Sequence, residues 1–175
     1  LSMKRKQPGF TLLELLTVVA ILAILATLAV VGYRAYMERA RAPDIIERYD
    51  ALRVSVGASA QAGKTDDCAQ FAQNLGKANL DSAYATLAYG FEATPGGYRP
   101  VLNVCALADP AKPLRIPVAR AAHDTMLKTG MVEKNAVLTE SVVSYALRLS
   151  DGDAALCKSA PPAVASACGT APATT

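Results

Sequence analysis

The chain has 175 residues, of which 52% are hydrophobic and 19% are charged. Its 18 Lys and Arg outnumber its 15 Asp and Glu, but Lys4, Arg5 and Lys6 stand together ahead of a long apolar run. Without them the basic and acidic residues balance at 15 each, so the remaining chain is close to neutral. No later cluster of Lys and Arg with interleaved aromatic residues follows, which argues against a nucleic-acid-binding protein.

The apolar run extends from Leu12 to Val31 and is interrupted only by Glu14, Thr17 and Thr27. As a helix, it would cover the ~30 Å of a bilayer core at a rise of ~1.5 Å per residue. A carboxylate in such a span costs roughly 3 kcal/mol, so Glu14 is a candidate functional residue. The preceding basic residues predict a cytoplasmic N-terminus and export of everything after Val31.

Residues 4–14 read KRKQPGFTLLE. This string, with the apolar stretch that follows, resembles the N-terminal signal of type IV pilins and type II secretion pseudopilins over about residues 4–35. In that family a dedicated peptidase cuts after a glycine, here Gly9, and methylates the new N-terminus, here Phe10. The fifth residue of the mature family member is a glutamate, here Glu14. The resemblance implies an α+β pilin-like fold, in which a long N-terminal helix, half transmembrane, packs on a small antiparallel sheet with extra short helices.

The resemblance also implies a function without catalysis, cofactor or metal. The chain would be a structural subunit, major or minor, of a type IV pilus-like filament. It would lie first in the bacterial inner membrane as a single-pass protein with a cytoplasmic N-terminus, then in an extracellular pilus or a periplasmic filament. The implied partners are the inner membrane, prepilin peptidase, the inner-membrane assembly platform, and copies of itself and other pilins through the N-terminal helix. In the filament, Glu14 would pair with the Phe10 α-ammonium and set the register.

Several alternatives remain open. A secretory signal peptide would have a shorter apolar region followed by a small-residue cleavage site, and a plain membrane anchor has no use for a buried glutamate. Within the family, the chain could instead be a pseudopilin of a type II secretion system, or a minor or tip pilin whose domain binds a ligand or surface. The roles of adhesion, motility and DNA uptake, the choice between major and minor subunit, and a start at Leu1 or Met3 are also open.

The sequence predicts five segments. These are a cleaved leader at 1–9, a filament-core helix at 10–32, its amphipathic continuation at 33–62, a globular domain at 63–168 and a flexible tail at 169–175. In the continuation, apolar residues recur at spacings of three and four, which is typical of a half-buried helix. Pro43 predicts a bend near residues 39–43, and Gly63 a stop.

The sequence of the globular domain predicts short helices and strands. We expect a helix at 66–75 capped by Thr65, strands at 84–93 and 98–107, a helix at 118–128, a strand at 141–150 and a further short strand at 154–158. The sequence Thr94-Pro95-Gly96-Gly97 predicts a hairpin between the first two strands. In the 141–150 strand, Val143, Tyr145, Leu147 and Leu149 would form the buried face.

The four cysteines, Cys68, Cys105, Cys157 and Cys168, all lie on the exported side and predict two disulfides. Cys157 and Cys168 enclose a short loop with a small closure entropy, so we expect them to pair, leaving Cys68 with Cys105.

A metal site is not expected. Zinc is disfavoured because there is no Cys-x-x-Cys and His123 is the only histidine. Asp151-Gly152-Asp153 is a fragment of a calcium loop without the remaining ligands, and a polar turn is the better interpretation. Because secretion pseudopilins can bind calcium in a comparable loop, a calcium site at Asp151-Gly152-Asp153 is a minor alternative.

Overall fold

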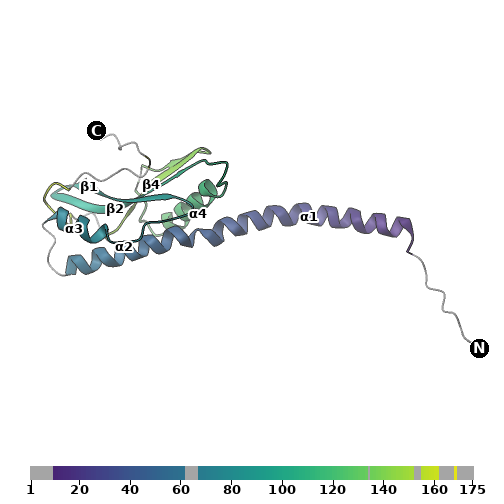
Figure 1. Cartoon of the computed structure of the whole chain (residues 1–175), viewed down its shortest axis with the longest axis horizontal. Coiled ribbons are helices and arrows are strands. Elements are labelled where there is room, and N and C mark those ends of the chain that lie inside the picture. Colours follow the sequence, from purple (N-terminus) through teal and green to yellow (C-terminus); the bar gives the residue numbers. More distant parts are fainter. Residues whose placement is uncertain (1–9, 62–66, 134, 152–154, 162–167, 169–175) are drawn as a thin grey trace, which may run out of the picture. The chain divides into compact units, whose positions relative to one another are not determined.

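A computed structural model describes residues 10–61, 67–133, 135–151, 155–161 and 168. The chain divides into two compact units, one ending at Met37 and the other beginning at Glu38. The elements, coloured along the chain in Figure 1, follow in the order α1 Leu12–Arg41, α2 Pro43–Gln61, α3 Cys68–Leu75, β1 Thr86–Thr94, β2 Gly97–Leu107, α4 Arg115–Leu127, β3 Val137–Leu138 and β4 Val142–Arg148.

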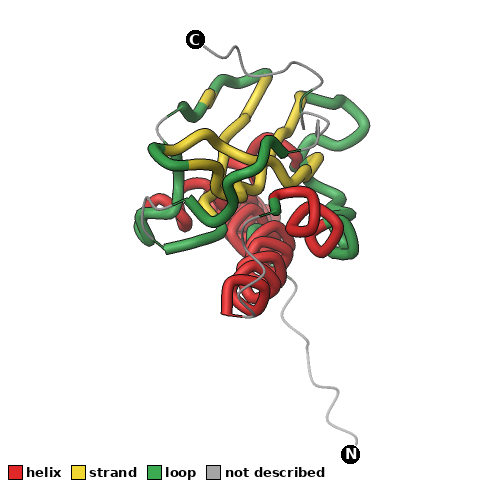
Figure 2. Tube along the Cα trace, turned by 90° about the vertical axis from the view of Figure 1, so that its left-hand side faces the viewer, coloured by secondary structure: helices red, strands yellow, loops and turns green. Residues whose placement is uncertain are grey.

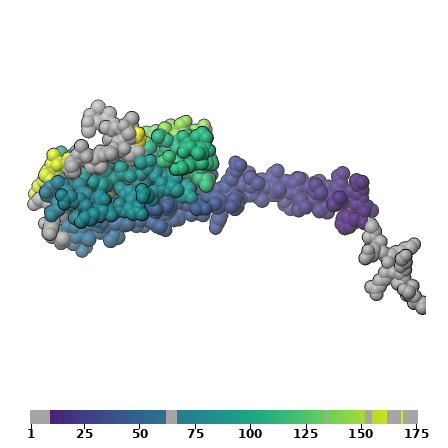
Figure 3. All heavy atoms as spheres, viewed as in Figure 1, coloured from purple at the N-terminus to yellow at the C-terminus, as the bar shows by residue number. Residues whose placement is uncertain are grey.

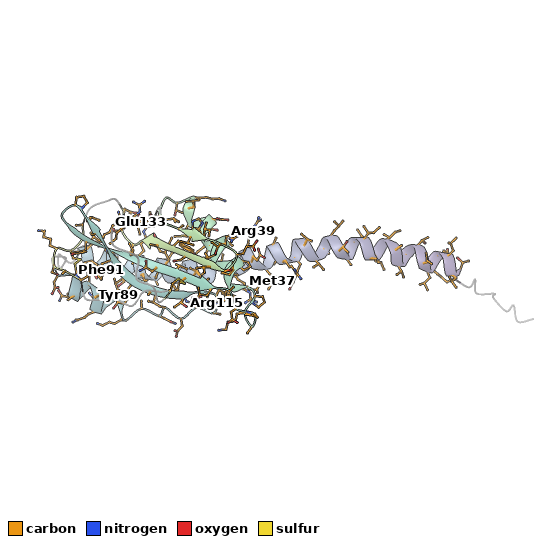
Figure 4. The ribbon with its side chains drawn as sticks, turned by 90° about the horizontal axis from the view of Figure 1, so that it is seen from above. Met37, Arg39, Tyr89, Phe91, Arg115 and Glu133 are labelled. Carbon is orange, nitrogen blue, oxygen red and sulfur yellow. A yellow bond between two sulfur atoms is a disulfide. The ribbon has the colours of Figure 1, made fainter. Side chains whose placement is uncertain are left out.

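Helix α1 has no buried residue. Every residue from Phe10 to Tyr36 is exposed. Figure 3 draws the atoms of this helix in purple, and Figure 4 shows its side chains projecting on both sides. A helix that is apolar on every side is typical of a fully buried core helix or of a membrane span.

The helix is interrupted at Ala42, directly before Pro43, where α2 begins. Proline is suited to the first helical position because the backbone donor that it lacks would be unpaired there anyway. The Ala42 carbonyl accepts hydrogen bonds from the backbone N–H groups of Ile45 and Ile46, at 3.1 and 3.4 Å. The interruption lies within residues 39–43, where Pro43 predicted a bend.

Helix α2 is amphipathic, as expected, and buries Ile45, Tyr49, Leu52 and Val56. The Tyr49 hydroxyl donates to the Arg148 carbonyl of β4 at 2.8 Å, which fixes the helix against the sheet. The helix ends at Gln61, and the predicted stop at Gly63 lies outside the described residues.

Helix α3 begins later than predicted. Its N-cap is Asp67, whose side chain accepts from the Ala69 N–H at 2.9 Å, while Thr65 lies outside the described residues. The predicted apolar face is confirmed, with Cys68, Phe71, Ala72 and Leu75 all buried.

The four strands form one antiparallel sheet in the order β1-β2-β4-β3. Strands β1 and β2 are joined at the predicted hairpin, where Gly96 has a φ of +106°, a conformation that favours glycine. Strand β4 buries Val143, Tyr145 and Leu147, followed by Leu149, as the alternation predicted. Strand β3 was not anticipated, and the expected strand at 154–158 is reduced in the described residues to a single bridge between Cys157 and Tyr98.

Helix α4 begins three residues before the predicted Val118, with Pro117 in its first turn, where a missing N–H leaves no helical hydrogen bond unmade. Its buried side chains join those of α2 and α3 in one core against the sheet. Tyr89 and Phe91, on β1, pack at the margin of this core (Figure 4). Figure 2 shows the strands as a layer over the helices. The expected α+β pilin-like arrangement is confirmed.

Candidate functional site

The start of α1 is closed by a reciprocal pair of hydrogen bonds. The Glu14 N–H donates to Thr11 Oγ1 at 3.2 Å, and the Thr11 N–H donates to Glu14 Oε2 at 3.2 Å. The Thr11 hydroxyl also donates to Glu14 Oε2, at 3.0 Å. This is a capping box, in which a threonine at the N-cap and a glutamate three residues later satisfy each other's backbone donors. The carboxylate also lies at the positive end of the helix dipole.

Sequence reasoning missed this role, although the Thr11-x-x-Glu14 spacing was visible. It assigned Glu14 only to the α-ammonium of Phe10. In the structure Glu14 already has partners within its own chain, so its carboxylate is held at the helix start before any assembly. Phe10, directly ahead of the cap, is 77% exposed. Gly9, the other half of the predicted cleavage site, lies outside the described residues.

The other two polar side chains of the apolar run are also satisfied locally. The Thr17 hydroxyl donates to the Glu14 carbonyl at 2.9 Å, and the Thr27 hydroxyl donates to the Ile24 carbonyl at 2.7 Å. Polar groups in lipid need internal partners, because no water is there to replace them. The run therefore meets the requirement of a membrane segment by itself. From Leu12 onward, the described chain has one helical stretch that is long and apolar enough to cross a membrane.

The model of the prokaryotic N-terminal methylation motif matches residues 4–30. The matched residues include the basic cluster, Gly9, Phe10, the capping box and most of the apolar run. The motif, the long N-terminal helix and the small antiparallel sheet together are consistent with a type IV pilin-like protein. No curated protein and no solved structure matches it. The motif implies processing by prepilin peptidase and assembly into filaments, and it points to a structural protein rather than to an enzyme family.

The disulfide pairing predicted from the sequence is wrong. The structure joins Cys68 to Cys157, with Cα atoms 5.2 Å apart, and Cys105 to Cys168, with Cα atoms 5.4 Å apart. Both distances lie in the normal range for disulfides. The two bridges span 89 and 63 residues instead of the short loop between Cys157 and Cys168.

Backbone pairing explains the error. The Tyr98 N–H donates to the Cys157 carbonyl at 2.7 Å, which attaches the segment after β4 to the beginning of β2. The Cys68 N–H donates to the Ser159 hydroxyl at 2.9 Å, which brings the start of α3 to the same segment. The short-loop argument considered only the entropy of an open chain. In the folded domain, the sheet and α3 decide which sulfur atoms meet.

The remaining residues singled out in the sequence have structural partners. His123 is buried, with its ring edge-on to Tyr145 at 5.1 Å between centroids and Nδ1 3.1 Å from Asp124 Oδ1. Asp151 accepts from Arg53 Nη2 at 2.7 Å, while Gly152 and Asp153 lie outside the described residues. Among the residues that the structure describes, no group of three His, Cys, Asp or Glu could hold a metal ion.

One arginine on the sheet is buried and paired with carboxylates. Arg99 of β2 is only 6% exposed and donates to Glu92 Oε2 through Nε at 3.0 Å and Nη2 at 2.8 Å. Its Nη2 also donates to Glu133 Oε1 at 2.6 Å, and Arg148 Nε lies 3.2 Å from the same oxygen. Glu133 is labelled in Figure 4. These pairs tie β1, β2 and β4 to the segment after α4, so they serve the domain's structure.

Proposed function

We propose that this chain is a prepilin that becomes a structural subunit of a type IV pilus-like filament. In the precursor, the leader at residues 1–9 lies on the cytoplasmic side of the inner membrane, and α1 crosses the bilayer. Prepilin peptidase cuts between Gly9 and Phe10 and methylates the Phe10 amine. The observation that carries the proposal is the match of the methylation motif to residues 4–30, a stretch that continues into α1, a helix without a buried residue.

Assembly would move α1 out of lipid and among the α1 helices of neighbouring subunits. Its exposed Leu, Ile and Val side chains then gain packing contacts that lipid tails provide less well. Because lipid is already apolar, little hydrophobic free energy is gained, and close packing and polar contacts must supply the driving force.

Glu14 is the polar contact that such a filament needs. Cleavage creates an α-ammonium at Phe10, next to the cap that holds the Glu14 carboxylate. A charge enclosed in an apolar core is strongly unfavourable without a partner. We therefore propose that Glu14 pairs with a Phe10 ammonium, its own or a neighbour's, and that only cleaved subunits are stable in the core.

The two disulfides favour a pilus over a secretion pseudopilus. An extracellular fibre is exposed outside the cell, where a cross-linked domain is of more use than in a filament that stays in the periplasm. Bridges spanning 89 and 63 residues each stabilise the domain by an amount on the order of 4 kcal/mol in the chain-entropy model. Filaments sheared from the cell surface would contain the chain if it is a pilin, and a surface fraction without it would favour the secretion role.

The decisive experiment is mass spectrometry of the mature N-terminus. The expected result is a chain that begins at N-methylated Phe10. Gly9→Ala and Gly9→Leu provide a graded control, because glycine lets the backbone approach the peptidase without a side-chain clash. An intact leader on assembled subunits, or a first residue beyond Thr27, would contradict the proposal.

A further inference from the structure

The aromatic residues of the first unit lie only at the ends of its apolar run. Phe10 precedes the run, Tyr33 and Tyr36 follow it, and no aromatic residue lies between Phe10 and Tyr33. The side chains of Tyr33 and Tyr36 are 64% and 67% exposed. Nothing in the packing of the described chain explains why large aromatic rings should stand there.

The two tyrosines share one side of α1. Residues three positions apart in an α-helix are separated by about 60° around its axis and by ~4.5 Å along it. Arg34 stands between them in sequence and is exposed, and Glu38 and Arg39 follow. The chain thus changes within a few residues from wholly apolar, through tyrosine, to charged.

That order is the one favoured across a membrane interface. A tyrosine ring is apolar and its hydroxyl is polar, so the side chain is most stable where hydrocarbon meets headgroups. The apolar run together with Gly32, that is Leu12 to Gly32, has 21 residues and spans ~31 Å, about the thickness of the hydrocarbon core. Tyr33 therefore lies where the core ends.

We infer that Tyr33 and Tyr36 form an interfacial anchor that binds the phospholipid headgroup region of the outer leaflet and sets the depth of α1. The inference rests on the proposed membrane-bound precursor. Nineteen positions separate Glu14 from Tyr33, a distance of ~28 Å along the helix. With the tyrosines at the outer interface, Glu14 lies at the inner one, and the bond between Gly9 and Phe10 is presented to the cytoplasm.

The chain contains no tryptophan, so a single introduced tryptophan reports its own depth without background. Three variants serve: Tyr33→Trp, Tyr36→Trp and, as the matched control, Leu22→Trp at the midpoint of the run. Each full-length chain is placed in phosphatidylcholine and phosphatidylglycerol vesicles, in which one lipid carries bromine either near the headgroup or near the chain end. Leu25→Trp replaces the control if Leu22→Trp does not insert.

The expected result is a reversal between positions. Bromine near the headgroup should quench Tyr33→Trp and Tyr36→Trp about twofold more than bromine near the chain end, and the control should show the opposite preference. Stronger quenching of either tyrosine variant by the deep bromine would overturn the inference. So would quenching by aqueous iodide with no response to either lipid.

Anchoring itself needs a second measurement. Leu16→Trp reports depth near the inner end of the run, first with both tyrosines present and then with Tyr33→Ala and Tyr36→Ala. The ratio of shallow to deep quenching should change by about twofold when the tyrosines are removed, because nothing then holds the outer end. Val30→Ala with Val31→Ala is the matched control and should leave the ratio unchanged. An unchanged ratio without the tyrosines would mean that they are not an anchor.

These measurements need neither peptidase nor filament. If the quenching pattern fails while the mature chain still begins at Phe10, only the anchor is refuted. If the pattern holds while the leader is never removed, the prepilin function is refuted and the anchor stands.

Discussion

The side chains of the two units find their hydrogen-bond partners and their burial in opposite ways. In the first, the polar groups of Glu14, Thr17 and Thr27 bond within three residues, and no apolar side chain is buried among its described residues. In the second, the decisive contacts join residues far apart, such as Tyr49 to Arg148 and Cys68 to Cys157. The polar groups of the first unit are thus satisfied locally while the apolar side chains of α1 stay exposed, whereas the second unit buries a core of its own. A helix of the first kind can exchange lipid for protein neighbours without unfolding the domain that it carries.

Removing a disulfide should have the largest effect on the second unit. Cys68→Ala with Cys157→Ala opens a bridge spanning 89 residues and should lower the free energy of unfolding by about 4–5 kcal/mol. Cys105→Ala with Cys168→Ala should cost nearly as much. Urea unfolding of the full chain in detergent, followed by circular dichroism, gives both values. Peptide mapping without reduction that recovered Cys68 linked to Cys105 would contradict the connectivity described above.

A matched pair of leucines tests the contrast directly. Leu52 on α2 is fully buried, whereas Leu22 on α1 is 57% exposed. Leu52→Ala should lower the free energy of domain unfolding by about 3 kcal/mol, through lost burial and the cavity left behind. Leu22→Ala should leave the same measurement unchanged and instead reduce the amount of the chain in sheared filaments. Equal effects of the two changes on unfolding would erase the distinction between the units.

The two roles of Glu14, as a member of the capping box and as the charge that pairs with the Phe10 ammonium, can be tested separately. Glu14→Gln keeps an oxygen acceptor for the capping box but removes the charge, whereas Thr11→Ala breaks the box and keeps the charge. Glu14→Gln, Glu14→Ala and Glu14→Val should leave insertion and cleavage intact and reduce incorporation into filaments about tenfold or more, because the Phe10 ammonium loses its partner.

Two other substitutions should reduce incorporation into filaments less. Thr11→Ala should incorporate nearly normally, and Glu14→Asp should be partly defective because its side chain is shorter. Co-expression with the unchanged chain and quantification in sheared filaments measures each variant. Normal incorporation of Glu14→Val would show that packing alone sets the register.

Alkaline pH should weaken the second unit through its buried tyrosines. Burial raises the pKa of Tyr145 above its ordinary value near 10, and burial also raises the pKa of Tyr49. Since the neutral phenols are favoured in the folded domain, their contribution is complete below pH ~10 and is lost as the pH rises further, at up to ~1.4 kcal/mol per pH unit for each. Urea unfolding between pH ~8 and ~10.5 should show this decline, and Tyr145→Phe should reduce its slope, leaving the contribution of Tyr49. A decline of equal slope in that variant would contradict the assignment.

The smallest effect is expected at the surface. Arg53 pairs with Asp151 at 2.7 Å, but their side chains are 39% and 75% exposed, so Arg53→Ala should cost less than ~1 kcal/mol. Arg99→Ala is the buried counterpart and should cost about 3–5 kcal/mol, because it removes the buried cation that Glu92 and Glu133 share. Urea unfolding of the two variants gives the comparison, and similar losses would mean that exposure does not govern these pairs.

What the sequence predicted well is what depends on neighbours along the chain. The buried stripe of α2, the apolar face of α3 and the alternation in β4 all follow from residue periodicity, and the hairpin follows from Pro95-Gly96. The start of α4 was placed too late because Pro117 was not recognised as a first-turn residue. The capping box was visible in the sequence but was overlooked, since attention to the charge of Glu14 obscured its spacing from Thr11.

What the sequence could not provide is what depends on tertiary structure. Val137 and Leu138 form a strand of only two residues, too short for a pattern, and they pair because β4 presents an edge. The disulfides follow from where the segment after β4 meets β2 and α3. Loop length, which is all that the sequence offers, favoured the wrong partners.

The order of the cysteines along the chain has a consequence for biogenesis. Each bridge joins an early cysteine, Cys68 or Cys105, to a late one, Cys157 or Cys168. A chain that crosses the membrane from its amino-terminal side exposes the early thiols to the oxidant well before their native partners arrive. Those two thiols must stay apart until then, and a premature link between them would have to be reshuffled. For the exported domain of the proposed prepilin, a disulfide isomerase should therefore matter more to the yield than an oxidase alone.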